Sequence, residues 1–201
     1  AGTKRRSRKI TRRKRGFTSL RIIAGKYAKR NLHTLKSNAT RPTSDKVKGS
    51  LFNSLGQFFD GGRVLDLYAG SGALGVEAVS RGYDEAVLVD ISGQACQVIK
   101  KNVELTKEEE RFRVLKCSDN RAIKILQDEG KKFDLVFLDP PYAKQKIVKI
   151  MTKLLENNLL NEKALVIAET DEHDELPEVS GFSIIKDHQL GRTKVKVYER
   201  D

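Results

Sequence analysis

The segment from Phe133 to Tyr142 constrains the fold most strongly, because the apolar run of residues 135–138 is followed at once by Asp139-Pro-Pro-Tyr. An apolar run without polar alternation is typical of a strand buried on both faces of a parallel sheet. Pro140 and Pro141 then end the strand, because proline has no N–H for the sheet ladder. Ligands of open α/β sheets bind outside the carboxyl ends of the strands. The segment is either an ordinary strand exit or, as we favour, a rigid acidic binding corner.

Strand-like and helix-like segments alternate from residue 61 almost to the end of the chain, which predicts a mostly parallel, doubly wound α/β sheet. The predicted strands are residues 63–67, 86–90, 112–116, 133–138 and 164–169. The predicted helices are residues 73–81, 94–105, 120–127 and 145–156. Two further strand-like runs, 182–189 and 193–199, flank Gly191 and predict a closing antiparallel hairpin.

Residues 20–60 precede this pattern and predict a small hairpin followed by a helix. The hairpin is expected from strand-like runs at 20–24 and 31–35, and the helix from a hydroxyl cap near residue 43 or 44. The side of the helix expected to face the core carries Val47, Leu51, Phe52, Leu55 and Phe59. Its other side carries Lys46, Lys48 and Asn53, expected in solvent or flanking an anionic substrate. The expected organisation is a tail at 1–19, this segment at 20–60 and the main α/β domain at 61–201.

Basic residues are concentrated at the start of the chain. The net charge is +12, but the first twenty residues hold nine Lys and Arg and no acid, which leaves +3 for the remainder. We expect residues 1–19 to be disordered when alone, and they suit a nucleic-acid-binding arm, a targeting segment or residues added for expression. Cys96 and Cys117 lack metal-ligand spacing, and no apolar run is long enough to cross a membrane. We therefore expect a cytoplasmic protein without a metal.

A glycine-rich segment follows Asp66, with Gly70, Gly72 and Gly75 spaced as Gly-x-Gly-x-x-Gly at a predicted strand-to-helix turn. Asp90 follows at the end of the next predicted strand. This arrangement is typical of a nucleotide-cofactor site, in which the second acid accepts hydrogen bonds from both ribose hydroxyls. The other cofactor contacts expected from the loop and from the second strand end are Tyr68, Ala69, Ser71 and Ile91.

The charge of Asp66 favours one cofactor over another. A pyrophosphate seated on this loop would be repelled by that carboxylate, whereas the ammonium and sulfonium of S-adenosylmethionine would be attracted. We therefore predict S-adenosylmethionine rather than NAD. Asp119, with Ser118 and Asn120 beside it, is expected to accept a hydrogen bond from the adenine amine, although Asp119 could instead cap the next helix.

The acidic corner suits methyl transfer to an exocyclic base amine. Such a transfer needs the amine lone pair held in line with the departing sulfur. The Asp139 carboxylate and the Pro140 carbonyl can each accept an N–H of the amine, which frees its lone pair and stabilises the positive charge that develops. Tyr142 offers a ring on which a flipped base can stack. The predicted catalytic residues are Asp139, Pro140, Pro141 and Tyr142.

These motifs also resemble a known family. Asp66-x-x-Ala-Gly-Ser-Gly with Asp139-Pro-Pro-Tyr resembles methyltransferases acting on amino groups of nucleic-acid bases. The segments Arg21-Ile-Ile-Ala-Gly, Thr40-Arg-Pro-Thr-Ser-Asp-Lys-Val-Lys-Gly-Ser-Leu-Phe-Asn53 and Leu67-Tyr-Ala-Gly-Ser-Gly-Ala-Leu-Gly-Val-Glu-Ala78 look like the bacterial small-subunit (16S) ribosomal RNA guanine-N2 methyltransferases.

The resemblance covers about residues 20–198. It implies a Rossmann-like, class I S-adenosylmethionine-dependent methyltransferase that acts on guanine N2 of ribosomal RNA, within a small-subunit particle or an assembly intermediate. It also implies that Arg41 and Thr43 lie beside the cofactor or the target base. We expect a monomer.

Two other functions remain open from the sequence alone. A DNA adenine-N6 methyltransferase would use the same corner, but such enzymes usually carry an added recognition region, and no such insert is visible between the predicted sheet elements. A basic RNA-binding assembly factor with a vestigial cofactor site would share the motifs without catalysis. Methylation of a ring carbon is disfavoured, because neither cysteine lies at the corner to act as the nucleophile.

Overall fold

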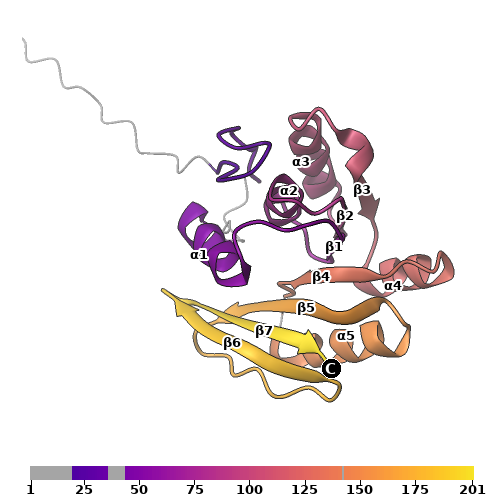
Figure 1. The fold of residues 1–201 in the computed structure, drawn as a ribbon. Helices are drawn as coiled ribbons and strands as arrows, with labels where there is room; N and C mark the ends of the chain where they lie inside the picture. Colours follow the sequence, from indigo (N-terminus) through magenta and orange to yellow (C-terminus); the bar gives the residue numbers. More distant parts are fainter. Residues whose placement is uncertain (1–19, 36–43, 142) are drawn as a thin grey trace, which may run out of the picture.

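A computed structural model describes residues 20–35, 44–141 and 143–201, so the basic tail, Arg41, Thr43 and Tyr142 lie outside the described residues. Among the residues described, seven strands form one sheet in the order β3-β2-β1-β4-β5-β7-β6 (Figure 1). The strands are β1 (Arg63–Asp66), β2 (Glu85–Asp90), β3 (Phe112–Lys116), β4 (Phe133–Leu138), β5 (Leu160–Asp171), β6 (Phe182–Leu190) and β7 (Thr193–Arg200). The first five are parallel to one another, and β7 is antiparallel to β5 and β6. The predicted parallel sheet with an antiparallel end is confirmed.

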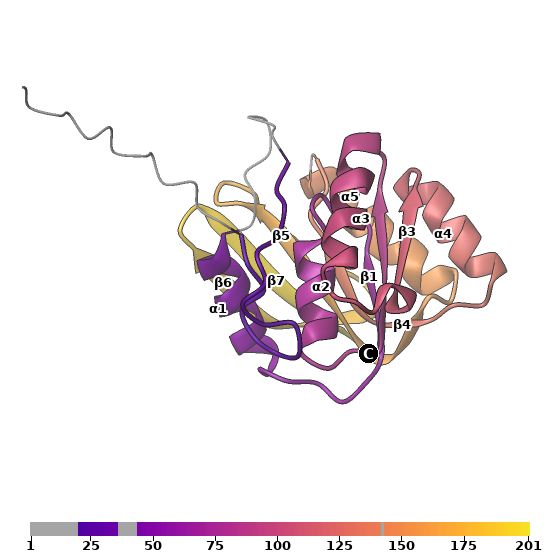
Figure 2. The same cartoon turned by 90° about the horizontal axis from the view of Figure 1, so that it is seen from above.

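Helices cover both faces of this sheet. They are α1 (Asp45–Leu55), α2 (Ala73–Ser80), α3 (Gly93–Glu104), α4 (Asp119–Asp128) and α5 (Ala143–Glu156), with a 3-10 turn η1 (Glu109–Arg111) before β3. Helices α1, α2 and α3 lie on one face, and α4 and α5 lie on the other (Figures 1 and 2). Each helix predicted from the sequence is present, with ends displaced by at most a few residues.

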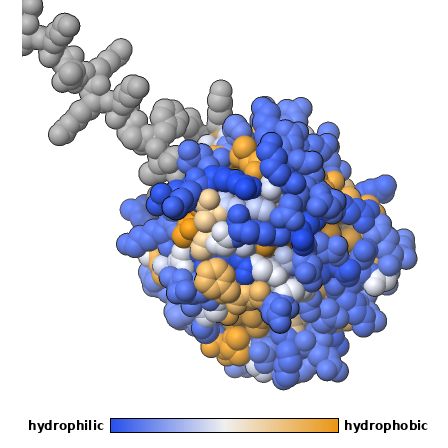
Figure 3. Space-filling view, turned by 45° about the horizontal axis from the view of Figure 1, so that its top comes forward, coloured by the Kyte–Doolittle hydropathy of each residue, from blue (hydrophilic) through white to orange (hydrophobic). Residues whose placement is uncertain are grey.

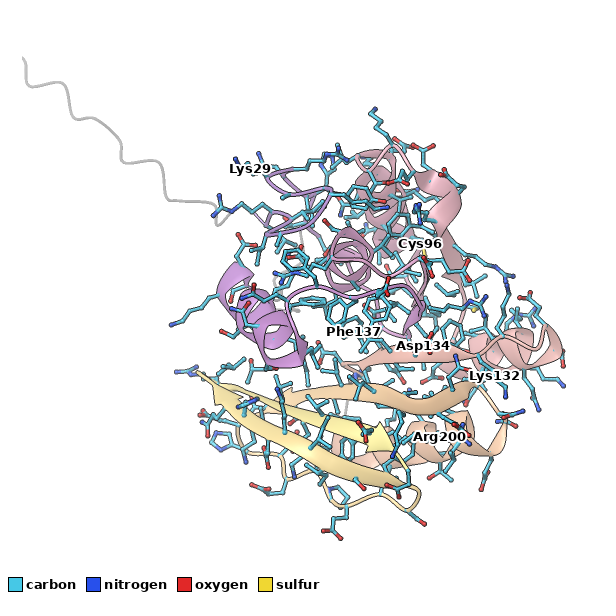
Figure 4. The ribbon with its side chains drawn as sticks, in the orientation of Figure 1. Lys29, Cys96, Lys132, Asp134, Phe137 and Arg200 are labelled. Atoms are coloured by element: carbon cyan, nitrogen blue, oxygen red, sulfur yellow. The ribbon has the colours of Figure 1, made fainter. Side chains whose placement is uncertain are left out.

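Strand β4 shows why its sequence is apolar without alternation. Val136 and Leu138 belong to the core beneath α4 and α5, while Leu135 and Phe137 belong to the core beneath α1 and α2. Phe137, labelled in Figure 4, packs edge-on against Phe52 of α1 with ring centroids 6.0 Å apart. Burial on both faces therefore requires an apolar side chain at each of these positions.

Helix α1 begins as predicted and ends earlier than its apolar pattern suggested. The Ser44 hydroxyl caps it by accepting a hydrogen bond from Val47 N at 3.2 Å. The helix ends at Leu55, because Gly56 takes a φ of 106°, which is not helical. Phe59 therefore lies beyond the helix, where its ring packs on Tyr83 at 4.7 Å.

The N-terminal hairpin pairs less than its sequence predicted. Its two arms meet at one bridge, Arg21 with Asn31, flanked by a hydrogen bond from Ile22 N to Arg30 O at 2.9 Å. Pairing stops there because Ile23 N donates to the Glu77 carboxylate of α2, at 3.0 Å to Oε2. The turn then lies so close to α2 that a Cβ on Gly25 would stand 1.8 Å from the carbonyl oxygen of Ser80. The segment is held by the helix rather than by its own strands.

Lys48 was predicted on the outer side of α1, and that prediction is wrong. Its side chain is fully buried, and its Nζ donates to the Arg21 carbonyl at 2.6 Å and lies 3.8 Å from Glu77 Oε2. Burial lowers the pKa of Lys48, although the Glu77 carboxylate opposes this. The N-terminal segment covers the side of α1 that the pattern left to solvent, whereas Lys46 and Asn53 are exposed as expected.

Glu77 is the centre of this buried cluster. Its carboxylate also accepts from Arg81, with Nη2 to Oε1 at 3.0 Å, and both side chains are at most 3% exposed. We predict that Glu77→Gln lowers the free energy of unfolding by roughly 3–5 kcal/mol, because it leaves the Lys48 and Arg81 cations buried without their counter-charge. Thermal and urea unfolding measure the change.

The matched control is Asp128→Asn, which removes an exposed ion pair with Lys124 on α4. Exposed pairs of this kind contribute roughly 0.3–0.5 kcal/mol, so stability should scarcely move. Equal effects of the two substitutions would show that the Glu77 cluster does not hold the N-terminal segment in place.

Candidate active site

A cavity of about 640 Å³ opens at the carboxyl ends of the parallel strands. It lies where the strand order reverses between β1 and β4, which is the usual ligand position in an open α/β sheet. Its lining comes from the ends of β1, β2, β4 and β5, from the segments after β1 and β3, and from Thr34 and Leu35 of the N-terminal segment. One face of the molecule shows a small apolar area surrounded by hydrophilic side chains (Figure 3).

The glycine loop joins β1 to α2 and supplies one wall of the cavity. Gly70 and Gly72 have φ angles of 59° and 80°, in the left-handed region that favours glycine. Gly75 serves packing instead, because a Cβ there would stand 2.2 Å from Leu88 Cδ2 of β2. Ala69 N donates to the Val89 carbonyl at 2.8 Å and fixes the loop against β2. Ala69, Gly70 and Ser71 line the cavity.

Asp90 ends β2 beside this loop. Its Oδ2 accepts from Gly70 N at 2.9 Å and its Oδ1 from Ser92 N at 2.9 Å. Two carboxylate oxygens have about four acceptor positions, so these bonds orient Asp90 and leave capacity for two ribose hydroxyls. The next residue, Ile91, is 73% exposed and lines the cavity, so it offers an apolar surface for a nucleoside to cover.

Asp66 ends β1 and is only 3% exposed. Its carboxylate accepts from Tyr68 N at 3.2 Å. Burial raises the pKa of Asp66 to about 7, against that hydrogen bond, and the charges of Asp139 and Asp90 raise it further. A cationic ligand would reverse this balance, because it would stabilise the ionised form.

Asp119 lies at the third strand end, at the start of α4. Its Oδ2 accepts from the Tyr68 hydroxyl at 2.6 Å and from Lys146 Nζ at 3.2 Å. Burial alone would raise the pKa of Asp119, but these two donors outweigh it and lower the pKa. The helix cap is Ser118, which accepts from Arg121 N, so Asp119 is not needed as the cap.

Two functions in this corner were not assigned from the sequence. Tyr68 was expected only as a loop contact, yet its hydroxyl joins the glycine loop to Asp119, and burial and that bond raise its pKa. Lys146 was not singled out, although a basic residue on the first turn after Asp-Pro-Pro-Tyr was a visible signal. Asn120 accepts from Lys153 of α5 at 2.6 Å and does not line the cavity.

The acidic corner, which the sequence analysis predicts to be catalytic, directly follows β4. Asp139 and Pro141 line the cavity, and Pro140 is buried between them. The Asp139 side chain is accessible, but the surrounding protein excludes enough water to raise the pKa of its carboxyl to about 6. The carboxylate is therefore mostly ionised at neutral pH.

Glu169 on β5 is a further acid in the same cavity, and it was not identified from the sequence. It is 6% exposed, and its Oε1 has no hydrogen-bond partner. Burial raises the pKa of Glu169 to about 8, with additional effects from Asp139 and Asp66. The available signal was an acid at the end of a predicted apolar strand, the same signal that identified Asp139.

Asn102 of α3 holds the N-terminal segment over the glycine loop. Its Oδ1 accepts from His33 N at 2.7 Å, and its Nδ2 donates to the carbonyls of His33 at 3.0 Å and Ser71 at 2.8 Å. The residues that follow, Thr34 and Leu35, line the cavity. The fully buried Asn102 amide therefore holds the end of the N-terminal segment over the glycine loop.

Within residues 20–35, 44–141 and 143–201, which the structure describes, no helix is long and apolar enough to span a bilayer. In the same ranges, His, Cys, Asp and Glu side chains form no group that could hold a metal ion.

The sheet order, the glycine loop at the switch point and the acid that ends β2 define a class I S-adenosylmethionine-dependent methyltransferase. The residues present fit the cofactor, since Asp90 can accept from the ribose hydroxyls and a cationic group would stabilise the ionised form of the buried Asp66 carboxyl. S-adenosylmethionine supplies an activated methyl group. SMU.776, solved in complex with SAH, has this fold, with a TM-score of 0.65 and 18% identity over 77% of this chain and 48% of that chain.

The family described as Conserved hypothetical protein 95 matches residues 20–199, and the chain belongs to it. The Ribosomal RNA small subunit methyltransferase D of Haemophilus influenzae is 34% identical over 181 residues, which cover 90% of this chain and 93% of that protein. A solved structure described as a conserved hypothetical protein of Streptococcus pyogenes is 48% identical, with a TM-score of 0.73 over 77% of this chain and 96% of that chain. The family resemblance drawn from the sequence is confirmed.

We predict that Asp66→Asn stabilises the ligand-free protein at pH 8 and weakens its binding of S-adenosylmethionine. Because the folded-state pKa is raised from 3.8 to about 7, ionising Asp66 costs stability as the pH rises through that interval, and below it the variant should match the wild type. Melting temperatures at pH 4 and pH 8, with and without cofactor, measure both effects. A gain of 1 kcal/mol corresponds to roughly 2–4 °C for a chain of this size.

Asp60→Asn is the control, because Asp60 is exposed and precedes β1 outside the cavity. It should change neither property. An Asp66→Asn protein that melts below the wild type at pH 8, or that binds cofactor normally, would contradict this account of Asp66.

Proposed function

We propose that this protein transfers the methyl group of S-adenosylmethionine to the exocyclic N2 of a guanine in small-subunit ribosomal RNA. The observation that carries the proposal is the position of Asp139, which lines the same cavity as the cofactor loop and immediately precedes the buried Pro140. Relatives named Ribosomal RNA small subunit methyltransferase D support ribosomal RNA as the substrate.

Asp139 holds the acceptor amine in this mechanism. Its carboxylate accepts one N–H of the amine and the Pro140 carbonyl accepts the other, so the nitrogen lone pair is directed at the methyl carbon. As the new N–C bond forms, positive charge develops on the nitrogen and the carboxylate stabilises it. The raised pKa of Asp139, about 6, also makes its carboxylate a better acceptor for the proton that the amine then loses.

Residues outside the described ranges complete the proposed substrate site. Tyr142 follows Asp139 and Pro140 in sequence and is proposed to stack on the flipped base, and Arg41 and Thr43 to lie beside the base or the cofactor. Lys29 is exposed at the turn of the N-terminal segment (Figure 4). A cation there suits contact with RNA phosphates, which positions RNA without reading its sequence.

Nucleoside analysis tests this function directly. The protein is incubated with tritiated S-adenosylmethionine and, separately, with unmodified small-subunit particles, naked small-subunit RNA and duplex DNA. We expect label in N2-methylguanosine from an RNA substrate, and a monomeric enzyme in solution. Label only in N6-methyladenine from DNA, or no label in any substrate, would overturn the proposal.

We predict that Asp139→Ala lowers turnover by about a hundredfold or more while leaving cofactor affinity within a factor of about two. The reason is that the amine contact strengthens in the transition state, where a lost stabilising group typically costs about 10²–10³ in rate. Single-turnover methylation and calorimetry give the two quantities. Asp60→Ala, at an exposed site outside the cavity, is the control, and near-normal turnover of Asp139→Ala would remove Asp139 from the mechanism.

A further inference from the structure

Three carboxyl groups follow one another across the sheet at the cavity. Strand registry places Asp66 opposite Phe137, and Phe137 opposite Ile167. The last registered pair between β4 and β5 is Leu138 with Ala168, so Asp139 and Glu169 come next on adjacent strands. Asp66, Asp139 and Glu169 all line the cavity.

Glu169 lies away from the residues that fit the cofactor. Those residues come from the ends of β1 and β2 and from the segment after β3, which lie on one side of β4 in the sheet order. Glu169 is on β5, on the other side of β4, where β7 pairs Val195 with it. The part of the cavity beside Asp139 and Glu169 is therefore the part left for the acceptor base.

The unpartnered oxygen of Glu169 is available to a hydrogen-bonding group of a ligand. Among buried side-chain atoms of the described residues, only Glu169 Oε1 and Thr170 Oγ1 have no hydrogen-bond partner. Of these two residues, only Glu169 lines the cavity. Leaving a buried acceptor unsatisfied costs about 1–3 kcal/mol, which a ligand N–H would recover.

Guanine and adenine differ at the atom next to their reactive amine. In guanine the 2-amine is adjacent to N1–H, a donor, whereas in adenine the 6-amine is adjacent to a bare N1, an acceptor. With the amine held at Asp139, the neighbouring position on the base would face the neighbouring acid. An acceptor oxygen there pairs with guanine and meets a lone pair in adenine.

We propose that Glu169 selects guanine by accepting the N1–H of the target base while Asp139 and the Pro140 carbonyl hold its 2-amine. This inference rests on the proposed guanine-N2 function and adds the residue that recognises the base. The charge of the occupied site favours this acceptor role, because a cationic cofactor near Asp66 lowers the raised pKa of Glu169 and favours its carboxylate.

The test replaces the target guanine with 2-aminopurine, which keeps the 2-amine but has a bare N1. The substrate is the RNA or particle that the wild-type protein methylates, carrying either base at the mapped position. We expect wild type to prefer guanine by about a hundredfold or more in kcat/KM, because sites built to bond a substrate N–H reject analogues lacking it. In Glu169→Gln the preference should fall at least about tenfold, because an amide can accept from guanine N1–H or donate to the bare N1.

Glu162→Gln is the matched control, because Glu162 is exposed at the other end of β5. It should keep the wild-type preference. Glu169→Gln should weaken binding of S-adenosylmethionine by less than about tenfold, since only the charge coupling is lost, and thermal unfolding shows whether this isosteric variant remains folded. A merely structural role would lower activity on both bases without changing their ratio.

The possible outcomes separate this inference from the proposed function. If the wild type methylates guanine N2 but uses 2-aminopurine equally well, or if Glu169→Gln keeps the wild-type preference, the role of Glu169 is refuted and the function stands. If Glu169→Gln loses cofactor affinity tenfold with its preference intact, Glu169 belongs to the cofactor site and the inference is again wrong. If the wild type does not methylate guanine at all, the function and the inference both fail.

Discussion

Burial of several carboxyl groups at one edge of the sheet, with their mutual repulsion as a second effect, is the constraint that the site depends on. Parallel strands bring their carboxyl ends to the same edge, so the acids that end β1 and β4 and the one near the end of β5 are necessarily neighbours. Burial and the charges of Asp139 and Asp66 raise the pKa of Glu169 to about 8, and Asp139 in turn raises the pKa of Asp66. Ionisation of these buried carboxyl groups therefore lowers the stability of the ligand-free protein, but the same groups form a site suited to a cation. Functional sites often reduce stability in this way.

The rest of the fold holds this edge in place from both faces. Two apolar cores, one beneath α4 and α5 and one beneath α1, α2 and α3, keep the strands in register. The N-terminal cover of the cavity is held differently, by side chains of the helices it crosses. Glu77 receives the backbone of Ile23, and Asn102 binds that of His33, so the cover depends on α2 and α3 rather than on strand pairing.

The fold was predictable where local sequence decides it. Strands β3 and β4 have the predicted ends, and in β4 the apolar run of residues 135–138 is ended by Asp139 and two prolines. Lys48 was misplaced because helical periodicity assumes one covered side, whereas the N-terminal segment covers a second. For the site, Asp66, Asp90 and Asp139 could be identified from strand ends. The surroundings of Tyr68 and Glu169 could not be predicted in this way. The Tyr68 hydroxyl donates to Asp119, 51 residues away in sequence, and Glu169 lies beside β7, so both depend on tertiary contacts that a local sequence pattern does not record.

The same electrostatics couples the two parts of the cavity. Asp66 lies between the cofactor loop and the acids at β4 and β5, and its charge is one of the effects that raise the pKa of Glu169. A cationic ligand beside Asp66 would act on Asp139 and Glu169 with the opposite sign, so it would favour the ionised carboxylates that are proposed to accept N–H groups from the base. By thermodynamic reciprocity, a base bound to those carboxylates would strengthen binding of the cation to the same degree. Under the proposed function, this row of acids would therefore make cofactor binding and acceptor binding cooperative.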